Sequence, residues 1–219
     1  MSVLTLYTYF RSSAAYRVRI GLNLKGLEYE PQFVHLLKGG GEQHGDEYRH
    51  LNPQGLIPAL AIDSKSDILT QSLAILEYLE EKYPEPPLLP ASAEQRALVR
   101  SLALMVCCDT HPLNNLRVHS YLKEKLNINE ADRQKWYQHW VREGLNALET
   151  RLTAHRHDSP YCYGETPTLA DICLIPQMYN ALRFDCDISH FPILKKIYYN
   201  CLELEAFKKA SPENQPDSE

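Results

Sequence analysis

Two adjacent hydroxyl side chains, Ser12 and Ser13, follow Arg11 at the start of a segment with helical periodicity. A serine at this position usually caps a helix by accepting a hydrogen bond from a backbone N–H group. The same geometry also stabilises a thiolate, because hydroxyl and N–H groups at a helix start lower the pKa of a thiol below its free value of about 8.5. The spacing alone favours the cap and leaves the thiolate function open.

A second group of candidate residues surrounds Pro58. Ile57 and Pro58 precede an apolar run over 59–62 that is typical of a strand, and proline suits the first position of a strand. A cis bond here would leave the Ile57 peptide free to pair with an extended peptide. Gln71 and Ser72 open an amphipathic helix, whose free N–H groups favour a carboxylate. Together these features suit a small peptide with a free α-carboxylate. The alternatives are that Gln71 is only an exposed polar residue and that Ser72 only caps the helix.

Several arginines could bind carboxylates, which the guanidinium fork holds through two parallel hydrogen bonds. For any one arginine taken alone, a solvated position is the plainer interpretation. We keep that interpretation for Arg17 and Arg19, as ion-pair or structural residues. Arg11, Arg117 and Arg183 are candidates for a site that binds a dicarboxylate.

The turn 52–58 and the pair 71–72 resemble the glutathione site of the glutathione transferase superfamily. With the run Arg-Ser-Ser-Ala-Ala-Tyr-Arg-Val-Arg-Ile over 11–20, the chain is similar to the zeta class, the maleylacetoacetate and maleylpyruvate isomerases. The resemblance covers essentially the whole chain, down to Gln-Pro-Asp at 215–217.

This resemblance implies that glutathione is the cofactor, with Ser12 stabilising its thiolate and Arg11 beside it. The other implied cofactor-binding residues are Ser13, Gln43, Ile57, Gln71, Ser72, His111 and Asn115. One departure concerns the third position of the family's usual Ser-Ser-Cys, which is Ala14 here. A protein thiol therefore cannot act at that position, and the reactive thiol must be that of glutathione.

The implied reaction is cis–trans isomerisation of a maleyl keto acid to its fumaryl isomer, in the catabolism of aromatic compounds such as aromatic amino acids or in the gentisate pathway. The thiolate would add to the conjugated double bond and leave after rotation, while Arg11, Arg117 and Arg183 hold the carboxylates. Arg117 favours maleylpyruvate, and maleylacetoacetate stays open. The alternatives are a zeta-class transferase that conjugates or dehalogenates small electrophiles, and a non-catalytic interaction module of the same fold.

The composition argues against other classes of protein. A net charge of −5 disfavours nucleic acid as a partner, and no apolar run reaches the roughly 18 residues of a membrane-spanning helix. The N-terminus does not resemble a signal peptide, and the six cysteines form no Cys-x-x-Cys pair. These features predict a cytoplasmic protein without a metal site. The resemblance adds an expected homodimer.

Hydrophobic periodicity predicts two domains in the 219 residues. Residues 1–83 have the order βαβ-α-ββα of a thioredoxin-like α/β domain, with its first two strands parallel and a hairpin turn at 64–66. Residues 84–91 contain four prolines and form a stiff linker.

Residues 92–219 are predicted to form an all-helical, substrate-binding domain. One helix should run from Ser92 to about Thr110, where His111 and Pro112 interrupt it. Another should begin at a capping box that opens at Thr168. We expect the polar tail from 210 onward to be frayed.

Overall fold

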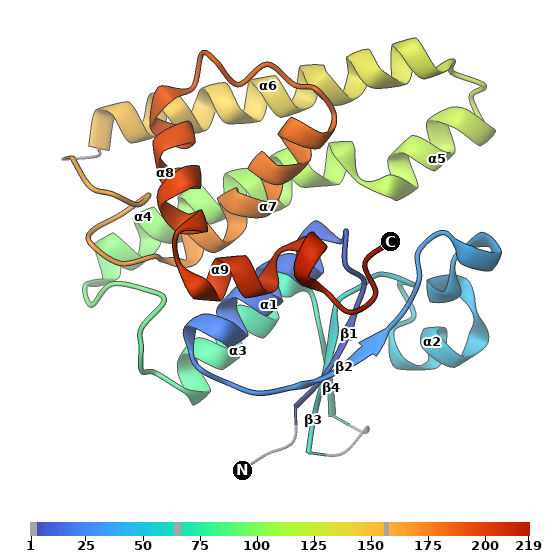
Figure 1. Cartoon of the computed structure of the whole chain (residues 1–219), viewed down its shortest axis with the longest axis horizontal. Coiled ribbons are helices and arrows are strands. Elements are labelled where there is room, and N and C mark those ends of the chain that lie inside the picture. Colours follow the sequence, from blue (N-terminus) through green and yellow to red (C-terminus); the bar gives the residue numbers. More distant parts are fainter. Residues whose placement is uncertain (1–3, 64–66, 156–157) are drawn as a thin grey trace. The chain divides into compact units, whose positions relative to one another are not determined.

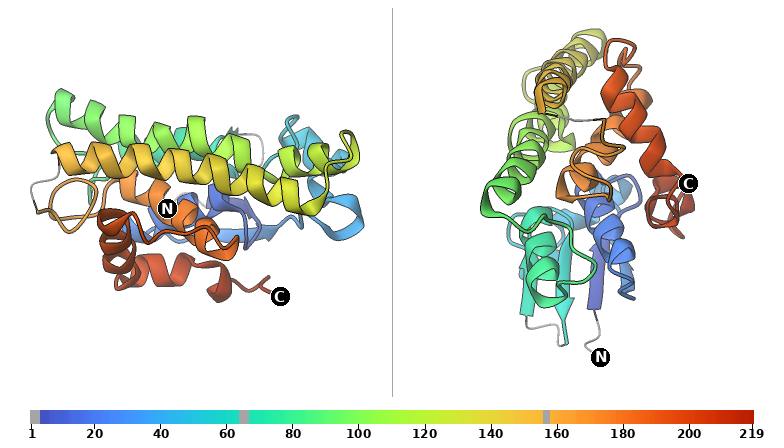
Figure 2. Two further views of the ribbon diagram at one scale, coloured as in Figure 1. Left: turned by 90° about the horizontal axis from the view of Figure 1, so that it is seen from above. Right: turned by 90° about the vertical axis from the view of Figure 1, so that its left-hand side faces the viewer.

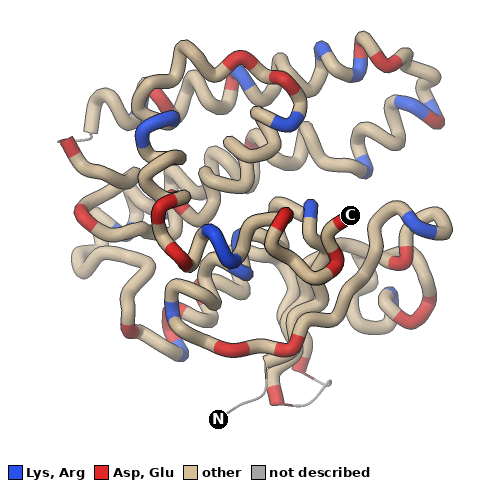
Figure 3. Tube along the Cα trace, viewed as in Figure 1, with Lys and Arg blue, Asp and Glu red and all other residues tan. Residues whose placement is uncertain are grey.

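The computed structural model describes residues 4–63, 67–155 and 158–219, so the predicted hairpin turn at 64–66 lies outside the described residues. The chain divides into two compact units. One comprises the chain up to Leu88 together with Leu204–Glu219, and the other is Leu89–Glu203. Within the described ranges, no helix has the length and apolarity needed to cross a membrane. Acidic and basic residues are interspersed along both units (Figure 3).

A four-stranded sheet in the order β2-β1-β3-β4 organises the first unit (Figure 1). β1 is parallel to β2 and antiparallel to β3, which pairs with β4 as a hairpin. The elements of the first unit up to the linker are β1 (Leu4–Thr8), α1 (Ser13–Leu24), β2 (Glu30–Phe33), the 3-10 turns η1 (Lys38–Gly40) and η2 (Glu42–His44), α2 (Asp46–Leu51), β3 (Ala59–Ile62), β4 (Asp67–Thr70) and α3 (Ser72–Lys82). The predicted thioredoxin-like order and the parallel first pair are confirmed.

Alternation along the strands gives the sheet two apolar faces, because successive side chains of a strand point to opposite sides. Leu4 and Leu6 of β1 pack with residues of α1 and α3 on one face. Tyr7 and Tyr9 belong to the other face, where they meet Tyr48 of α2. The sheet therefore holds α1 and α3 on the same face.

The C-terminal segment belongs to the first unit, which differs from the predicted helical domain over 92–219. α9 (Glu205–Ala210) lies against α1 in Figures 1 and 2 and is followed by a short 3-10 turn, η5 (Pro212–Asn214). Asn23 of α1 donates a hydrogen bond to the Ala206 carbonyl over 2.9 Å. Gln215 is buried, with its side-chain nitrogen bonded to two backbone carbonyls. The prediction of a frayed tail was wrong.

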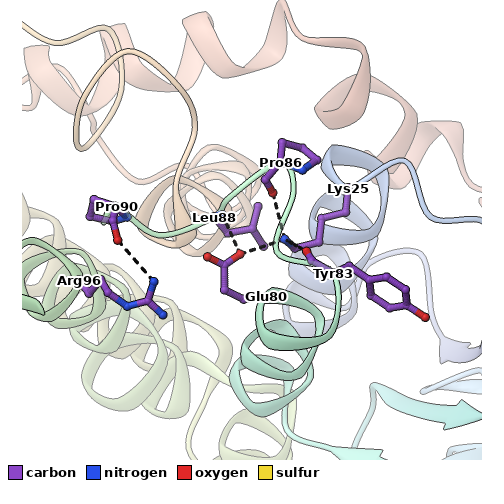
Figure 4. Close-up of polar contacts among 7 residues, drawn as sticks. All are labelled: Lys25, Glu80, Tyr83, Pro86, Leu88, Pro90 and Arg96. Carbon is purple, nitrogen blue, oxygen red and sulfur yellow. Dashed lines mark hydrogen bonds and ion pairs between the residues drawn. The ribbon is translucent and has the colours of Figure 1, made fainter. Parts of the chain in front are cut away.

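A buried ion pair connects α1, α3 and the proline-rich linker (Figure 4). Lys25 Nζ lies 2.9 Å from Glu80 Oε2 and also donates to the carbonyls of Tyr83 and Pro86. The same oxygen of Glu80 accepts the backbone N–H of Leu88 over 2.8 Å. Since both charges are buried and hydrogen-bonded, this cluster fixes the linker to the first unit.

Helices form the second unit. In chain order they are α4 (Ala93–Leu104), the π-helical segment η3 (Met105–Thr110), the 3-10 turn η4 (His111–Asn114), α5 (Leu116–Glu124), α6 (Glu130–His155), α7 (Leu169–Arg183) and α8 (Pro192–Leu202). At the start of this unit, Arg96 donates to the Pro90 carbonyl over 3.4 Å (Figure 4).

The break before Pro112 begins earlier than predicted. α4 ends at Leu104, and the backbone continues as a π-helix, in which Thr110 Oγ1 donates to the Met105 carbonyl. A Cβ atom at Gly144 would lie 2.0 Å from Thr110 Oγ1, so glycine permits α6 to approach this segment closely.

The predicted capping box is confirmed at the start of α7. Asp171 Oδ2 accepts hydrogen bonds from both the N–H and the hydroxyl of Thr168, and Oδ1 accepts the N–H of Cys162. Burial raises the pKa of Asp171 despite these three bonds. The box anchors the helix whose last residue is Arg183.

Candidate active site

Ser12 is the N-cap of α1, and its Oγ accepts a hydrogen bond from the Ala15 N–H over 3.2 Å. The capping prediction is confirmed. A hydroxyl that accepts a hydrogen bond keeps its own proton to donate. The half-buried Ser12 therefore combines a capping function with a donor that could serve an anion at the helix start.

The turn before β3 contains the predicted cis bond between Ile57 and Pro58. The preceding carbonyl, of Leu56, is held from two sides, by the Tyr48 hydroxyl at 2.8 Å and the Asn52 side-chain amide at 2.6 Å. Within the described part of the chain, the Ile57 N–H donates no hydrogen bond and the Ile57 C=O accepts none. They are therefore available to an extended peptide, as an added strand would use them.

Gln71 and Ser72 stand at the start of α3. Gln71 has a φ of 69°, a left-handed conformation that is uncommon for a residue other than glycine. Its side-chain amide donates to Gln54 over 2.7 Å. The first intrahelical bond runs from the Ile75 N–H to the Gln71 carbonyl, so the N–H groups of 72–74 have no intrahelical partner. This helix start is suited to an anion.

Arg17 was predicted to hold a solvated position as an ion-pair or structural residue, and the solvated position was wrong. Its side chain is 2% exposed, and Nη1 donates to Ser72 Oγ over 3.3 Å. Nε and Nη2 are buried without a partner among the described residues. A buried guanidinium with two unused nitrogens beside a helix start adds positive charge to the same anion site.

Arg19 is also fully buried rather than solvated, and burial lowers its pKa to about 10. Each of its three nitrogens donates a hydrogen bond within the first unit. Nε donates to the Ala210 carbonyl, Nη1 to Thr8 Oγ1 and the Tyr9 carbonyl, and Nη2 to the Phe10 carbonyl. One sequence signal could have identified both arginines: they are the only charged residues of α1.

The remaining predicted positions of the first unit are Arg11, Ser13 and Gln43. Ser13 is buried, and the Arg11 guanidinium stacks 4.6 Å above the Phe10 ring. Gln43 is buried in η2, where its nitrogen donates to the Leu36 carbonyl. Its Oε1 atom is buried without a partner in the described ranges.

The second unit contains the other predicted positions. Asn115 caps α5 by accepting the Arg117 N–H over 3.1 Å, and its amide nitrogen lies 3.5 Å from His111 Nε2. Arg117 is exposed on α5. Arg183, the last residue of α7, is also exposed and stacks 4.7 Å above the Phe184 ring.

A ring cluster brings the helices of these two arginines together. Phe184 stacks on Tyr137 of α6 with centroids 4.0 Å apart, and His119 of α5 packs edge-on against the same tyrosine. Burial lowers the pKa of His119, which favours its neutral form. The end of α7 and helix α5 are thus held on one part of α6.

Comparison with known proteins decides the family. Models of the glutathione S-transferase N-terminal and C-terminal domains match residues 6–87 and 120–205. A solved holo structure of a maleylpyruvate isomerase, described as a bacterial glutathione S-transferase of the zeta class, is 44% identical with a TM-score of 0.94, over 98% of this chain and 100% of that one. The chain belongs to the zeta class of the glutathione S-transferase family.

Two further relatives of this zeta-class glutathione S-transferase are informative. A probable maleylacetoacetate isomerase of Vibrio cholerae is 50% identical over the full length of both chains. A maleylacetoacetate isomerase of Methylobacterium extorquens, solved with bound malonate and glutathione, is 40% identical with a TM-score of 0.93, over 98% of this chain and 99% of that one. The comparisons thus include proteins named for both maleyl keto acids.

Proposed function

We propose that this zeta-class chain is a glutathione-dependent isomerase that converts a maleyl keto acid to its fumaryl isomer. The observation that carries the proposal is the donor set of the first unit. The unpaired Ile57 peptide suits the cysteinyl part of glutathione. The start of α3 with Ser72 and the buried, partly unpaired Arg17 suits its γ-glutamyl carboxylate. Ser12 adds a hydroxyl donor for the thiolate.

When bound, glutathione supplies a thiolate that adds reversibly to the conjugated double bond, so that rotation becomes possible and no glutathione is consumed. The Ser12 hydroxyl donates a hydrogen bond to the sulfur and keeps it ionised. Gln43, His111 and Asn115 complete the residues that we assign to glutathione, together with Ser13 and Gln71.

The substrate is a dianion, and we assign its carboxylates to Arg11, Arg117 and Arg183. The relative with bound malonate and glutathione supports a dicarboxylate as the class of substrate. Arginine also stabilises negative charge that develops on the keto oxygen during the reaction. We further propose a cytoplasmic homodimer that acts in aromatic catabolism, with the gentisate pathway as the source of substrate if maleylpyruvate is preferred.

Product analysis tests the isomerase against the two alternatives. The chain is incubated with each maleyl acid and a limiting amount of glutathione, while proton NMR follows the double bond and a thiol reagent follows free glutathione. An isomerase converts many equivalents of substrate and leaves the thiol concentration constant. Stoichiometric loss of thiol would instead identify a conjugating transferase. Absence of glutathione binding by calorimetry would identify a non-catalytic module.

A further inference from the structure

The tail 215–219 lies against the turn that leads into Ser12. Asp217 Oδ2 accepts a hydrogen bond from the Phe10 N–H over 3.0 Å, between residues 207 positions apart in the chain. The turn itself closes through the Ser12 N–H and the Tyr9 carbonyl at 3.0 Å. The last residues of the chain therefore touch the backbone two positions before the serine assigned to the thiolate.

The backbone groups of this turn are bound by side chains from α1 and from the C-terminal tail. Arg19 donates to the carbonyls of Tyr9 and Phe10, while Asp217 accepts the Phe10 N–H. Burial lowers the pKa of Arg19, and the Asp217 carboxylate partly opposes this lowering. A turn with its N–H and both carbonyls occupied has little freedom to change its peptide orientations.

The tail is itself anchored at several points. Arg19 Nε donates to the Ala210 carbonyl, which ties the end of α9 to the same guanidinium. Gln215 is buried and bonded to two backbone carbonyls. Glu219 pairs with Lys38 at 2.5 Å and His35 at 3.3 Å, on the segment that leads to Gln43.

We propose that Asp217 is a positioning residue for the thiolate site, because it fixes the turn that places the Ser12 hydroxyl. This inference rests on the proposed thiolate function of Ser12. The physical reason is that a donor to an anion acts only at a defined distance, and a displacement of about 1 Å can cost about 100-fold in rate. The C-terminal tail is in this respect a part of the site, although it supplies no group that touches glutathione.

The test compares Asp217→Ala with Asp217→Asn, since asparagine keeps an oxygen acceptor for the Phe10 N–H and loses the charge. Three measurements are made: amide hydrogen exchange over 9–12 without ligand, ultraviolet titration of the bound glutathione thiol, and affinity for S-methylglutathione, whose blocked thiol cannot use Ser12. Thermal unfolding confirms that each variant is folded at the assay temperature.

For Asp217→Ala we expect exchange at 9–12 to accelerate at least about 10-fold. The thiol pKa should rise toward the free value of about 8.5, while the affinity for S-methylglutathione stays within about twofold. Asp217→Asn should resemble the wild type in both its exchange rate at 9–12 and its thiol pKa. Unchanged exchange and thiol titration in Asp217→Ala would overturn the proposal, as would changes in both that only follow the unfolded fraction of the variant. If the wild type binds glutathione as a thiolate and yet isomerises neither acid, the proposed reaction fails while the positioning function of Asp217 still stands.

Discussion

Arg17 and Ser72 form a buried hydrogen bond between α1 and α3, with Nη1 3.3 Å from Oγ. Because the guanidinium can only donate, the Ser72 oxygen is the acceptor, and the serine proton is left for a further acceptor. Two more nitrogens of Arg17 are buried without a partner among the described residues. A buried cation with unused donors is unfavourable until an anion arrives, so the pair is poised to bind a carboxylate.

Replacing Arg17 should therefore weaken glutathione binding without unfolding the chain. For Arg17→Met we expect the Kd of glutathione to rise about 10- to 100-fold, the loss of about 1.5–3 kcal/mol that a hydrogen bond to a charged group contributes. Calorimetric titration measures it. A glutathione analogue with the glutamyl α-carboxylate converted to an amide is the matched ligand control. Its Kd should be nearly the same for Arg17→Met and for the wild type. An equal loss for both ligands would show that Arg17 supports the fold and not the carboxylate.

Ser12→Ala should lower kcat/KM about 10- to 1,000-fold, the effect of removing a donor to an anion, and should raise the thiol pKa of bound glutathione. The same substitution removes a helix cap, which costs about 0.5–2 kcal/mol of stability. Ser92→Ala is the matched control, because Ser92 caps α4 by accepting the Gln95 N–H. If both variants lose activity equally, Ser12 acts only as a cap.

Arg117 is expected to discriminate between the two maleyl acids. Maleylpyruvate is the shorter dianion, with its second carboxylate directly on the keto carbon, so it benefits more from an additional guanidinium. Arg117→Ala should lower kcat/KM for maleylpyruvate by the equivalent of about 2–5 kcal/mol, the effect of removing one partner of a desolvated charge pair. The loss should be smaller for maleylacetoacetate. Steady-state kinetics on both acids measure this, with Lys123→Ala on the same helix as the control. Preference of the wild type for maleylacetoacetate, or unchanged maleylpyruvate turnover in Arg117→Ala, would contradict the assignment.

The buried pair of Lys25 and Glu80 should stabilise the first unit and its linker. Lys25→Met leaves the Glu80 carboxylate buried without its cation, so the free energy of unfolding should fall by about 3–5 kcal/mol. Adding Glu80→Gln should recover part of this loss, because the remaining side chain is neutral. Chemical denaturation measures both variants. Lys135→Met, at an exposed pair with Asp132, should have the same free energy of unfolding as the wild type. A comparable loss in this variant would show that burial of the Lys25–Glu80 pair is not the cause.

Local chemistry made the elements and several site positions predictable from the sequence. The cap at Ser12, the capping box at Thr168 and the turn at Pro58 are each decided by residues a few positions apart. Apolar strand segments and helical periodicity predicted the order of elements βαβ-α-ββα along the chain, because each period marks its own kind of element. These signals lie within single turns or short segments, where spacing alone determines geometry.

Only the tertiary structure decided the environment of the buried charges and of the tail. Arg17 and Lys25 each meet a partner 55 positions away, one partner of Arg19 lies 191 positions away, and the partner of the Phe10 N–H lies 207 positions away. A charged residue in isolation is predicted to be solvated, because burying it without partners is unfavourable. Distant carbonyls, a hydroxyl and carboxylates reverse that balance once the sheet and α9 bring them to α1. Burial of such a charge therefore follows from the assembled fold and not from its neighbours in the sequence.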